Sequence, residues 1–122
     1  MTTTTQPKRS YRHGDVVLVL FPHSDLRTAK PRPTLVIQAN NLQTGLPQTI
    51  VAMITSKLIR ANHPSRVLIR LATPAGRQSG LLGDSVVMTD NLATVAQTAI
   101  DRAIGTLPIA DVEKALRHTL GL

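Results

Sequence analysis

The segment Asp15–Phe21 constrains the fold most strongly. Its sequence, DVVLVLF, is apolar at both alternating sets of positions after the first residue. Alternate residues of a strand face opposite sides of a sheet, so an unbroken apolar run predicts a strand that is covered on both sides. Pro22 should end this strand, because proline has no backbone N–H to donate to a ladder. We therefore expect a small β-rich core built around this segment.

Other apolar runs predict further strands around the first one. Most of these runs are rich in β-branched residues, and one alternates between apolar and basic side chains, which indicates one solvated face. Polar segments at His23–Pro33, Asn40–Pro47, Ser56–Ser65 and Gly76–Gly83 are predicted as loops. The predicted strands are Thr34–Ala39, Thr49–Thr55, Arg66–Leu71 and Asp84–Thr89, with weaker signals at Asn91–Ala96 and Ile104–Leu107.

The C-terminus is predicted to be a helix. Its apolar residues Ile109, Val112, Leu116 and Leu120 recur at helical spacing. Pro108 suits the first helical position, and Gly121 follows the last turn. We expect this helix to be a packing or dimer element rather than a reader of nucleic acid.

Five or six short strands closed by one C-terminal helix predict a mainly β fold, either a small barrel or a strongly twisted antiparallel sheet. The 122 residues fit one domain, residues 11–122, after a basic tail, residues 1–10, which we expect to be disordered. The chain has no apolar run long enough to span a bilayer, no secretory signal and no cysteine, and we expect a cytoplasmic protein.

The charge balance favours an anionic partner. Fourteen Lys and Arg residues stand against seven Asp and Glu residues, which gives a net charge of +7. Such an excess suits nucleic acid, an acidic protein segment, or both. A basic domain whose charge only keeps it in solution is the alternative, because charge alone names no function.

Arg32 is the first candidate for a functional residue. It lies in Lys30-Pro31-Arg32-Pro33, where a proline on each side narrows the backbone choices and fixes the direction of the side chain. A guanidinium held in this way can grip two phosphate oxygens and stabilise charge that develops in a transition state. Arg27 and Lys30 extend the basic segment. The alternative is a surface arginine in a proline-rich turn.

Thr55 is the second candidate, at the end of the apolar run TIVAMIT. Its hydroxyl can donate a hydrogen bond to a phosphate oxygen or help to orient a ribose 2′-OH. The alternative is that the hydroxyl bonds its own neighbouring backbone. Ser56 and Lys57 follow directly and allow the same two interpretations.

His23, Ser24 and Asp25 lie in the same predicted loop as Arg32. The unperturbed pKa of a histidine, ~6.5, would suit His23 to acid–base chemistry, although a loop histidine can also be simply solvated. No His-x-x-x-His pair occurs and the acids are scattered, so we expect neither a metal site nor a cofactor. With one Tyr, one Phe and no Trp, an aromatic platform for bases is not expected.

Four blocks of the sequence, GDVVLVLFP, KPRP followed by TLVIQ, TIVAMITS and DSVVMTDNLATV, resemble the MazF/PemK toxins of type II toxin–antitoxin systems. The similarity runs from about Tyr11 to Leu120. It implies a twisted SH3-like barrel, as in the MazF/PemK-like and CcdB-like folds, and a homodimer. It also implies metal-independent endoribonuclease activity on single-stranded RNA, usually mRNA, and a cognate antitoxin with an acidic disordered segment.

The resemblance also implies roles for residues. Arg32 and Thr55 match the catalytic pair of the family, in which the ribose 2′-OH attacks the adjacent phosphate and leaves a 2′,3′-cyclic phosphate and a 5′-OH. Arginine is a poor general base because its pKa exceeds 12, so His23 is the candidate that accepts the 2′ proton. Many relatives carry a glutamate before the Arg-Pro pair, where this chain has Asp25-Leu26-Arg27-Thr28. The residues expected to contact RNA are Ser24, Asp25, Arg27, Lys30, Ser56 and Lys57.

Two other functions stay open at this point. A toxin of the same barrel family can act without catalysis by binding and poisoning DNA gyrase. The retention of both Arg32 and Thr55 favours the ribonuclease, because the gyrase-binding branch does not need that pair. The third possibility is a simple basic nucleic-acid-binding module, which would bind in a salt-sensitive way without cleavage.

Overall fold

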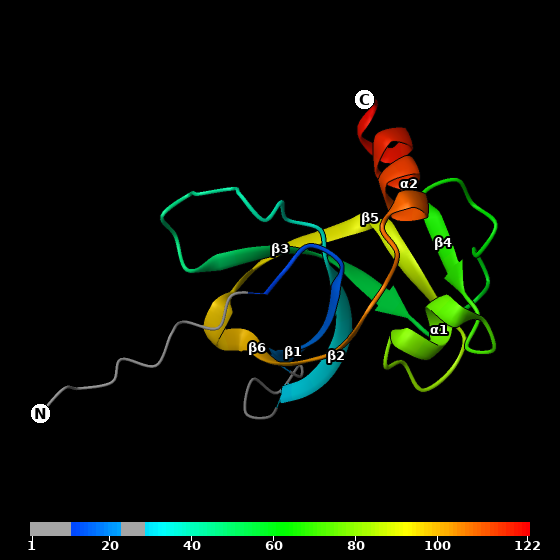
Figure 1. Ribbon diagram of the computed structural model, residues 1–122, viewed down its shortest axis with the longest axis horizontal. Helices are drawn as coiled ribbons and strands as arrows, with labels where there is room; N and C mark the ends of the chain where they lie inside the picture. The colour runs from blue at the N-terminus through cyan, green and yellow to red at the C-terminus, as the bar shows by residue number, and fades with distance from the viewer. Residues whose placement is uncertain (1–10, 23–28) are drawn as a thin grey trace, which may run out of the picture.

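The computed structural model describes residues 11–22 and 29–122, so the predicted tail, residues 1–10, lies outside the described residues. Figure 1 shows a curved β-sheet and a helix at the C-terminal end of the chain. The elements in chain order are β1 (Asp15–Pro22), β2 (Ala29–Val36), β3 (Gln48–Thr55), β4 (Arg66–Ile69), α1 (Pro74–Gln78), β5 (Ser85–Ala96), a 3₁₀ turn η1 (Gln97–Ala99), β6 (Ile100–Thr106) and α2 (Ala110–Leu120).

All neighbouring strands of the sheet are antiparallel, and their order is β4-β5-β3-β2-β1-β6. The two outer strands, β4 and β6, do not pair with each other in the described part of the chain, so hydrogen bonds do not close the sheet into a barrel. In Figure 1, α2 lies over the end of the sheet formed by β4 and β5. The predicted mainly β fold with a C-terminal helix is confirmed.

Two hydrophobic clusters cover the two faces of the sheet. Val16 belongs to one cluster, whereas Val17 and Val19 belong to the other, and all three are almost fully buried. This confirms that the first part of β1 is covered on both sides, as the unbroken apolar run predicts. Leu20, near the end of the strand, is 42% exposed, so the two-sided cover does not extend over the whole run.

The prediction of a loop over His23–Pro33 is wrong for its last five residues, because β2 begins at Ala29. The backbone carbonyl of Val36 accepts a hydrogen bond from Gly14 N over 2.9 Å, so the backbone groups of Val36 point towards β1. Successive residues in an antiparallel strand direct their backbone groups to opposite neighbours. Pro31 and Pro33 therefore face the other side, towards β3.

The two prolines fit in β2 because β3 is not paired with the strand at their positions. The β2–β3 ladder begins only at Thr34 opposite Met53. Pro31 and Pro33 thus lie in a part of the strand where no residue of β3 needs an N–H donor from them. The even-numbered residues keep the pairing with β1, in which Arg32 lies opposite Val19. Residues 23–28 of the predicted loop lie outside the described residues.

Other predicted boundaries also differ. The predicted loop Gly76–Gly83 overlaps α1, whose N-cap Thr73 accepts a hydrogen bond from Gly76 N, with Pro74 as its first residue. This Thr-Pro pair is a helix-start signal. The segments Asp84–Thr89 and Asn91–Ala96 were expected to be separate and instead form the single strand β5.

The ends of several elements shift by a few residues. The second strand ends at Val36 instead of Ala39, and β4 ends at Ile69 instead of Leu71. β6 extends from Ile100 to Thr106, beyond the weak signal that predicts it. α2 begins at Ala110 after the N-cap Ile109, so Pro108 precedes the helix instead of opening it.

Candidate active site

Arg32 on β2 and Thr55 on β3 both line one cleft, just beyond the point where the pairing of the two strands ends. Val36 pairs with Val51, Leu35 with Ala52 and Thr34 with Met53. Continuing this register by two residues brings Arg32 opposite Thr55. Directly opposed residues lie on the same face of an antiparallel sheet. The fold therefore places the two candidate residues, 23 positions apart in the sequence, across a gap between two strands.

The gap exists because the ladder between β2 and β3 stops. Pro31 and Pro33 have no N–H to donate on the side that faces β3, so a ladder continued past Thr34 would lack half of its hydrogen bonds. A cleft of about 690 Å³ opens there. Apolar side chains form most of its wall, and the described residues that line it include Leu18, Lys30, Arg32, Met53, Thr55, Ser56, Lys57, Leu82, Asp84, Met88, Asn91 and Ile104.

The Thr55 hydroxyl makes a local hydrogen bond to the backbone and can still bind a phosphate. Its Oγ1 accepts a hydrogen bond from Lys57 N over 3.1 Å, which is the local backbone contact expected as the alternative. A hydroxyl that accepts one hydrogen bond still has its own hydrogen to donate. The contact therefore fixes the direction of the oxygen and leaves the hydrogen available to a phosphate oxygen in the cleft.

The cleft is positively charged in its described part. Lys30, Arg32 and Lys57 line it and are exposed. Asp84 is the one carboxylate among the described lining residues, and its Oδ1 accepts a hydrogen bond from Leu71 N over 2.8 Å. Its Oδ2 lies 3.9 Å from Arg70 Nη1. The lysine and arginine charges in the cleft thus outnumber the acidic charge and favour an anion.

Five of the nine predicted site residues lie together in this cleft: Lys30, Arg32, Thr55, Ser56 and Lys57. The other four lie outside the described residues, namely His23, Ser24, Asp25 and Arg27. The proposed general base is among them. Its role therefore stays a prediction.

Sequence reasoning missed the contribution of β5. Met88 and Asn91 line the cleft from this strand, and Met53 lines it from β3. The sequence shows these residues only as members of apolar or polar runs. Their position depends on pairing between strands that are far apart in the chain. The block DSVVMTDN, which carries part of the family resemblance, was the one available signal.

A bulge in β5 interrupts its pairing with β3. Ala52 lies opposite Leu92, but Met53 lies opposite Met88, so residues 89–91 have no partner on β3. Extra residues on one strand bend it and redirect its side chains. The buried Thr89 anchors this bulge, because its Oγ1 donates to the Ser65 carbonyl over 2.6 Å.

Asp90 provides the second anchor of the bulge. Its carboxylate pairs with the guanidinium of Arg66 on β4, through contacts of 2.8 Å and 3.2 Å. The hydrogen bond from Arg66 lowers the pKa of Asp90 below its ordinary value, more strongly than partial burial raises it. Arg66 begins the run of alternating apolar and basic residues whose basic face is predicted to be solvated, yet only 15% of its side chain is exposed.

Residues 12–120 match one protein family, described as "PemK-like, MazF-like toxin of type II toxin-antitoxin system". The chain belongs to this family. The matched range includes all the described residues that line the cleft, so the cleft of this toxin belongs to the part of the chain that the family shares.

Among curated proteins, the toxin is similar to endoribonuclease MazF2 of Mycobacterium bovis and endoribonuclease MazF6 of Mycobacterium tuberculosis. Each is 33% identical over 107 residues, which cover 84% of this chain and 90% of the relative. The family expected from the four sequence blocks is confirmed.

Solved structures share the fold of the toxin. An endoribonuclease from a mycobacterial species, in complex with its cognate antitoxin, has a TM-score of 0.71 at 18% identity and covers 93% of this chain and 97% of its own. The Mycobacterium tuberculosis toxin MazF-mt6 has a TM-score of 0.63 at 26% identity, with 88% and 92% covered. A MazE–MazF structure from Deinococcus radiodurans has a TM-score of 0.67 at 19% identity, with 92% and 97% covered.

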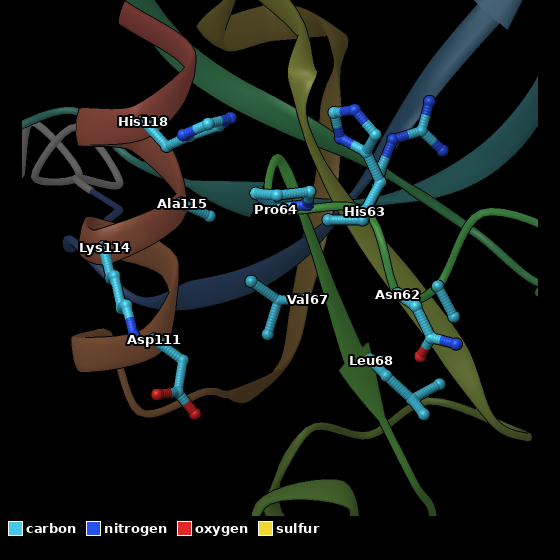
Figure 2. Close-up of a pocket in the computed structure, with 11 residues that line it drawn as sticks. Asn62, His63, Pro64, Val67, Leu68, Asp111, Lys114, Ala115 and His118 are labelled. Carbon is cyan, nitrogen blue, oxygen red and sulfur yellow. The ribbon is translucent and has the colours of Figure 1, made fainter. Parts of the chain in front are cut away.

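The toxin has a second pocket, of about 450 Å³, between α2 and the chain from Ala61 to Leu68. Figure 2 shows Lys114 and His118 on the helix side and His63 on the opposite side. The two imidazole rings have centroids 6.4 Å apart and meet edge to face. His63 Nδ1 accepts a hydrogen bond from Ser65 N over 3.1 Å. None of the predicted site residues that the structure describes lines this helix pocket.

A third pocket of about 340 Å³ lies at the hairpin between β2 and β3 and is lined by neutral amide, hydroxyl and apolar side chains, including Gln38, Thr44 and Gln97. Within residues 11–22 and 29–122, no three His, Cys, Asp or Glu side chains gather closely enough to hold a metal ion. Neither helix in these ranges has the length and apolar character needed to cross a membrane.

Proposed function

We propose that this toxin is a metal-independent endoribonuclease that cleaves single-stranded RNA, mRNA above all, between β2 and β3. The observation that carries the proposal is that Arg32 and Thr55 line the same positively charged cleft, at positions that the continued β2–β3 register would oppose. Two relatives at 33% identity are named endoribonucleases, which supports the activity. They do not favour the alternative of a gyrase-binding toxin or of a simple nucleic-acid-binding module.

The reaction that suits this cleft is an internal transfer on the RNA. The ribose 2′-oxygen attacks the adjacent phosphorus, and the bond from phosphorus to the 5′-oxygen of the next nucleotide breaks. The 2′-hydroxyl gives up its proton, and the leaving 5′-oxygen gains one. The products are a 2′,3′-cyclic phosphate and a 5′-hydroxyl, and no water or external reactant enters this step.

In this proposal Arg32 stabilises the extra negative charge on the phosphate oxygens as the phosphorane forms. A guanidinium provides two parallel N–H donors to two oxygens and keeps its charge throughout the reaction. The backbone pairing of Arg32 with Val19 holds this residue on a regular strand. Thr55 donates its hydroxyl hydrogen to a phosphate oxygen, with its oxygen fixed by Lys57 N.

The group that accepts the 2′ proton is proposed to be His23. Arg32 cannot serve at neutral pH, since its pKa is above 12. Asp84 lines the cleft, but one of its oxygens already accepts the Leu71 N–H. His23 precedes β2 in the sequence by only six residues, and a histidine has a pKa suited to this exchange.

The test is cleavage of a long single-stranded RNA in EDTA by the wild type, Arg32→Ala and Thr55→Ala. Cleavage by the wild type that is lost in both variants, with unchanged circular dichroism and melting temperature, would support the reaction and the two residues. A 2′,3′-cyclic phosphate on the upstream fragment would support the internal attack. Lys114→Ala, in the helix pocket, is the matched control and should cleave normally.

RNA left intact by the folded wild type would contradict the ribonuclease proposal. DNA gyrase supercoiling would then be measured with and without the toxin, since its inhibition would support the alternative function. His23→Ala and His23→Gln belong in the same assay. If both retain full activity across pH 5 to 8, His23 is not the base.

We also propose that the toxin acts in the cytoplasm as a homodimer restrained by a cognate antitoxin. Two solved relatives contain an antitoxin, an observation made on those proteins. An acidic, disordered antitoxin segment would complement the positive charge of Lys30, Arg32 and Lys57. Sedimentation equilibrium tests the dimer. Weaker direct binding of the antitoxin, measured without RNA, when Lys30 and Lys57 are both changed to Glu tests the proposed antitoxin surface.

A further inference from the structure

Two methionines lie side by side next to the candidate catalytic pair. Met53 on β3 is directly opposite Met88 on β5. Both are partly buried and both line the cleft. Met53 precedes Thr55 by two residues, so it lies on the same face of the sheet, about 7 Å along the strand. The methionine pair therefore borders the place where the scissile phosphate is proposed to bind.

The bulge in β5 brings an amide to the same place. Thr89 is tied to the Ser65 carbonyl, and it also lies 2.7 Å from Thr119 Oγ1 on α2. Asp90 is tied to Arg66 on β4. The third residue of the bulge, Asn91, is exposed, lines the cleft and has no side-chain hydrogen bond to any described residue. Thr89 and Asp90 thus hold the Asn91 amide beside the methionines, and no described side chain or backbone group binds it.

A nucleobase has the chemistry that suits this combination. Its faces are flat and apolar, and its edge carries hydrogen-bond donors and acceptors. Proteins usually pack bases on aromatic rings, but the only aromatic residues of the chain outside histidine, Tyr11 and Phe21, do not line the cleft. Methionine sulfur also makes favourable contacts with aromatic rings. An asparagine amide has a donor and an acceptor that match the edge of adenine.

We propose that Met53, Met88 and Asn91 form a subsite for one adenine base next to the scissile phosphate. The methionines support the face of the base, and Asn91 binds its edge. This inference rests on the proposed ribonuclease function. It makes Asn91 a determinant of the sequence that the toxin cleaves, separate from the residues that carry out the reaction.

The experiment uses an RNA pool with randomised nucleotides and sequencing of the cleaved ends. The wild type should enrich adenine at one position beside the cut. Asn91→Ala should reduce that enrichment by roughly 5- to 150-fold, the discrimination expected of a bidentate amide–base pair. Asn91→Asp should reduce it as well, because a carboxylate cannot donate to the acceptor nitrogen of adenine. Asn41→Ala, an exposed asparagine in the β2–β3 hairpin, should leave the profile unchanged.

The methionines are tested separately on one cleaved sequence. Met88→Ala should raise KM for that RNA, whereas Met88→Leu, which keeps the apolar surface, should restore most of the affinity. Melting temperatures of both variants show whether each remains folded. An unchanged KM in a folded Met88→Ala variant would contradict the proposal that the methionines support the face of the base.

The failures of the two proposals can be told apart. A wild type that cuts RNA with no adenine preference, or an Asn91→Ala variant with the wild-type profile, would overturn the adenine subsite and leave the ribonuclease standing. A folded wild type that cuts no RNA would overturn the ribonuclease, and the subsite with it.

Discussion

The Thr55 hydroxyl accepts a hydrogen bond from Lys57 N, and its hydrogen remains to be donated. Serine keeps both functions, whereas valine has nearly the same shape and neither. We therefore expect Thr55→Ser to retain most of the cleavage rate. Thr55→Val should lower kcat by roughly 10²-fold, as the loss of one donor to a developing negative charge does in other enzymes. Single-turnover cleavage rates of the two variants measure the difference.

An equal loss in both variants would mean that the hydroxyl and the methyl group of Thr55, which serine lacks, are both required. Equal retention would mean that the hydroxyl does not contact the phosphate. Melting temperatures are needed beside the rates, because the Lys57 N–H loses its acceptor in Thr55→Val.

Asp90 gives a prediction about pH. Its pKa is lower in the folded protein than in the unfolded chain, where it is near 3.9, chiefly because Arg66 donates to the carboxylate. The ion pair thus stabilises the fold above about pH 4, and this contribution is lost as the pH falls through the lowered pKa. The Asp90 side chain is 38% exposed, so solvent screening limits the effect to about 1 kcal/mol at most.

Asp90→Asn should accordingly unfold at a lower urea concentration than the wild type at pH 7. The difference between the two midpoints should narrow as the pH is lowered below about 4, where the wild-type carboxylate becomes protonated as well. A difference that is constant from pH 7 to pH 3 would show that the asparagine acts through packing or local geometry instead of charge.

At the scale of the elements, the prolines of β2 keep the cleft open. Replacing them in the double variant Pro31→Thr, Pro33→Val would return two N–H donors to the side that faces β3. Continuing the register, these donors would meet Ile54 and Ser56. We expect the ladder to extend, the two new amides to be protected from hydrogen exchange, and RNA cleavage to fall at least tenfold with the protein still folded.

Pro64→Ala, in the connection before β4, is the control for the loss of a proline. It should leave cleavage unchanged. Fast exchange at positions 31 and 33 together with full activity in the double variant would show that the prolines do not separate the strands.

The elements also show how far the sequence alone leads. Periodicity predicts β1, β3 and α2 well, because each is a local pattern of apolar residues. The two prolines in Lys30–Pro33 indicate a loop when only the sequence is read. A strand can hold them where one of its sides has no ladder partner, and only the pairing of β2 with β1 and β3 shows that this is the case here. The long β5 was divided in two because its bulge contains the polar residues Asp90 and Asn91.

The site was predictable to a similar degree. Arg32 and Thr55 came from local features and from the family resemblance, and the register now gives a physical reason to consider them together. Met53, Met88 and Asn91 could not be found in this way, because their common location arises from pairing across strands and from a bulge. His23 stays a prediction, since it lies outside the described residues.

At the scale of the whole molecule, the net charge of +7 predicts RNA binding that weakens with salt. Each phosphate contact to a single strand contributes about 0.7 to the slope of log K against log salt concentration. Lys57→Ala should reduce this slope by about 0.7, because Lys57 lines the cleft. Lys114→Ala carries the same change in net charge in the helix pocket and should leave the slope unchanged.

Binding would be measured with an oligonucleotide that carries 2′-deoxy nucleotides, which lacks the attacking hydroxyl and stays intact. Equal slopes for the two variants would indicate that the overall charge, and not the cleft, attracts the RNA. A reduced slope for Lys114→Ala alone would move the binding surface to the helix pocket.

The prolines of β2 also affect how the toxin can associate with other chains. Open strand edges are sites where a strand from another molecule can add and begin aggregation. Along the cleft, the edge of β2 offers the carbonyl oxygens of Pro31 and Pro33 but no N–H from either residue. A visiting strand would therefore find only half of the hydrogen bonds of a normal ladder there. The same two residues that leave the cleft open to a substrate protect its wall from strand exchange between copies of the toxin.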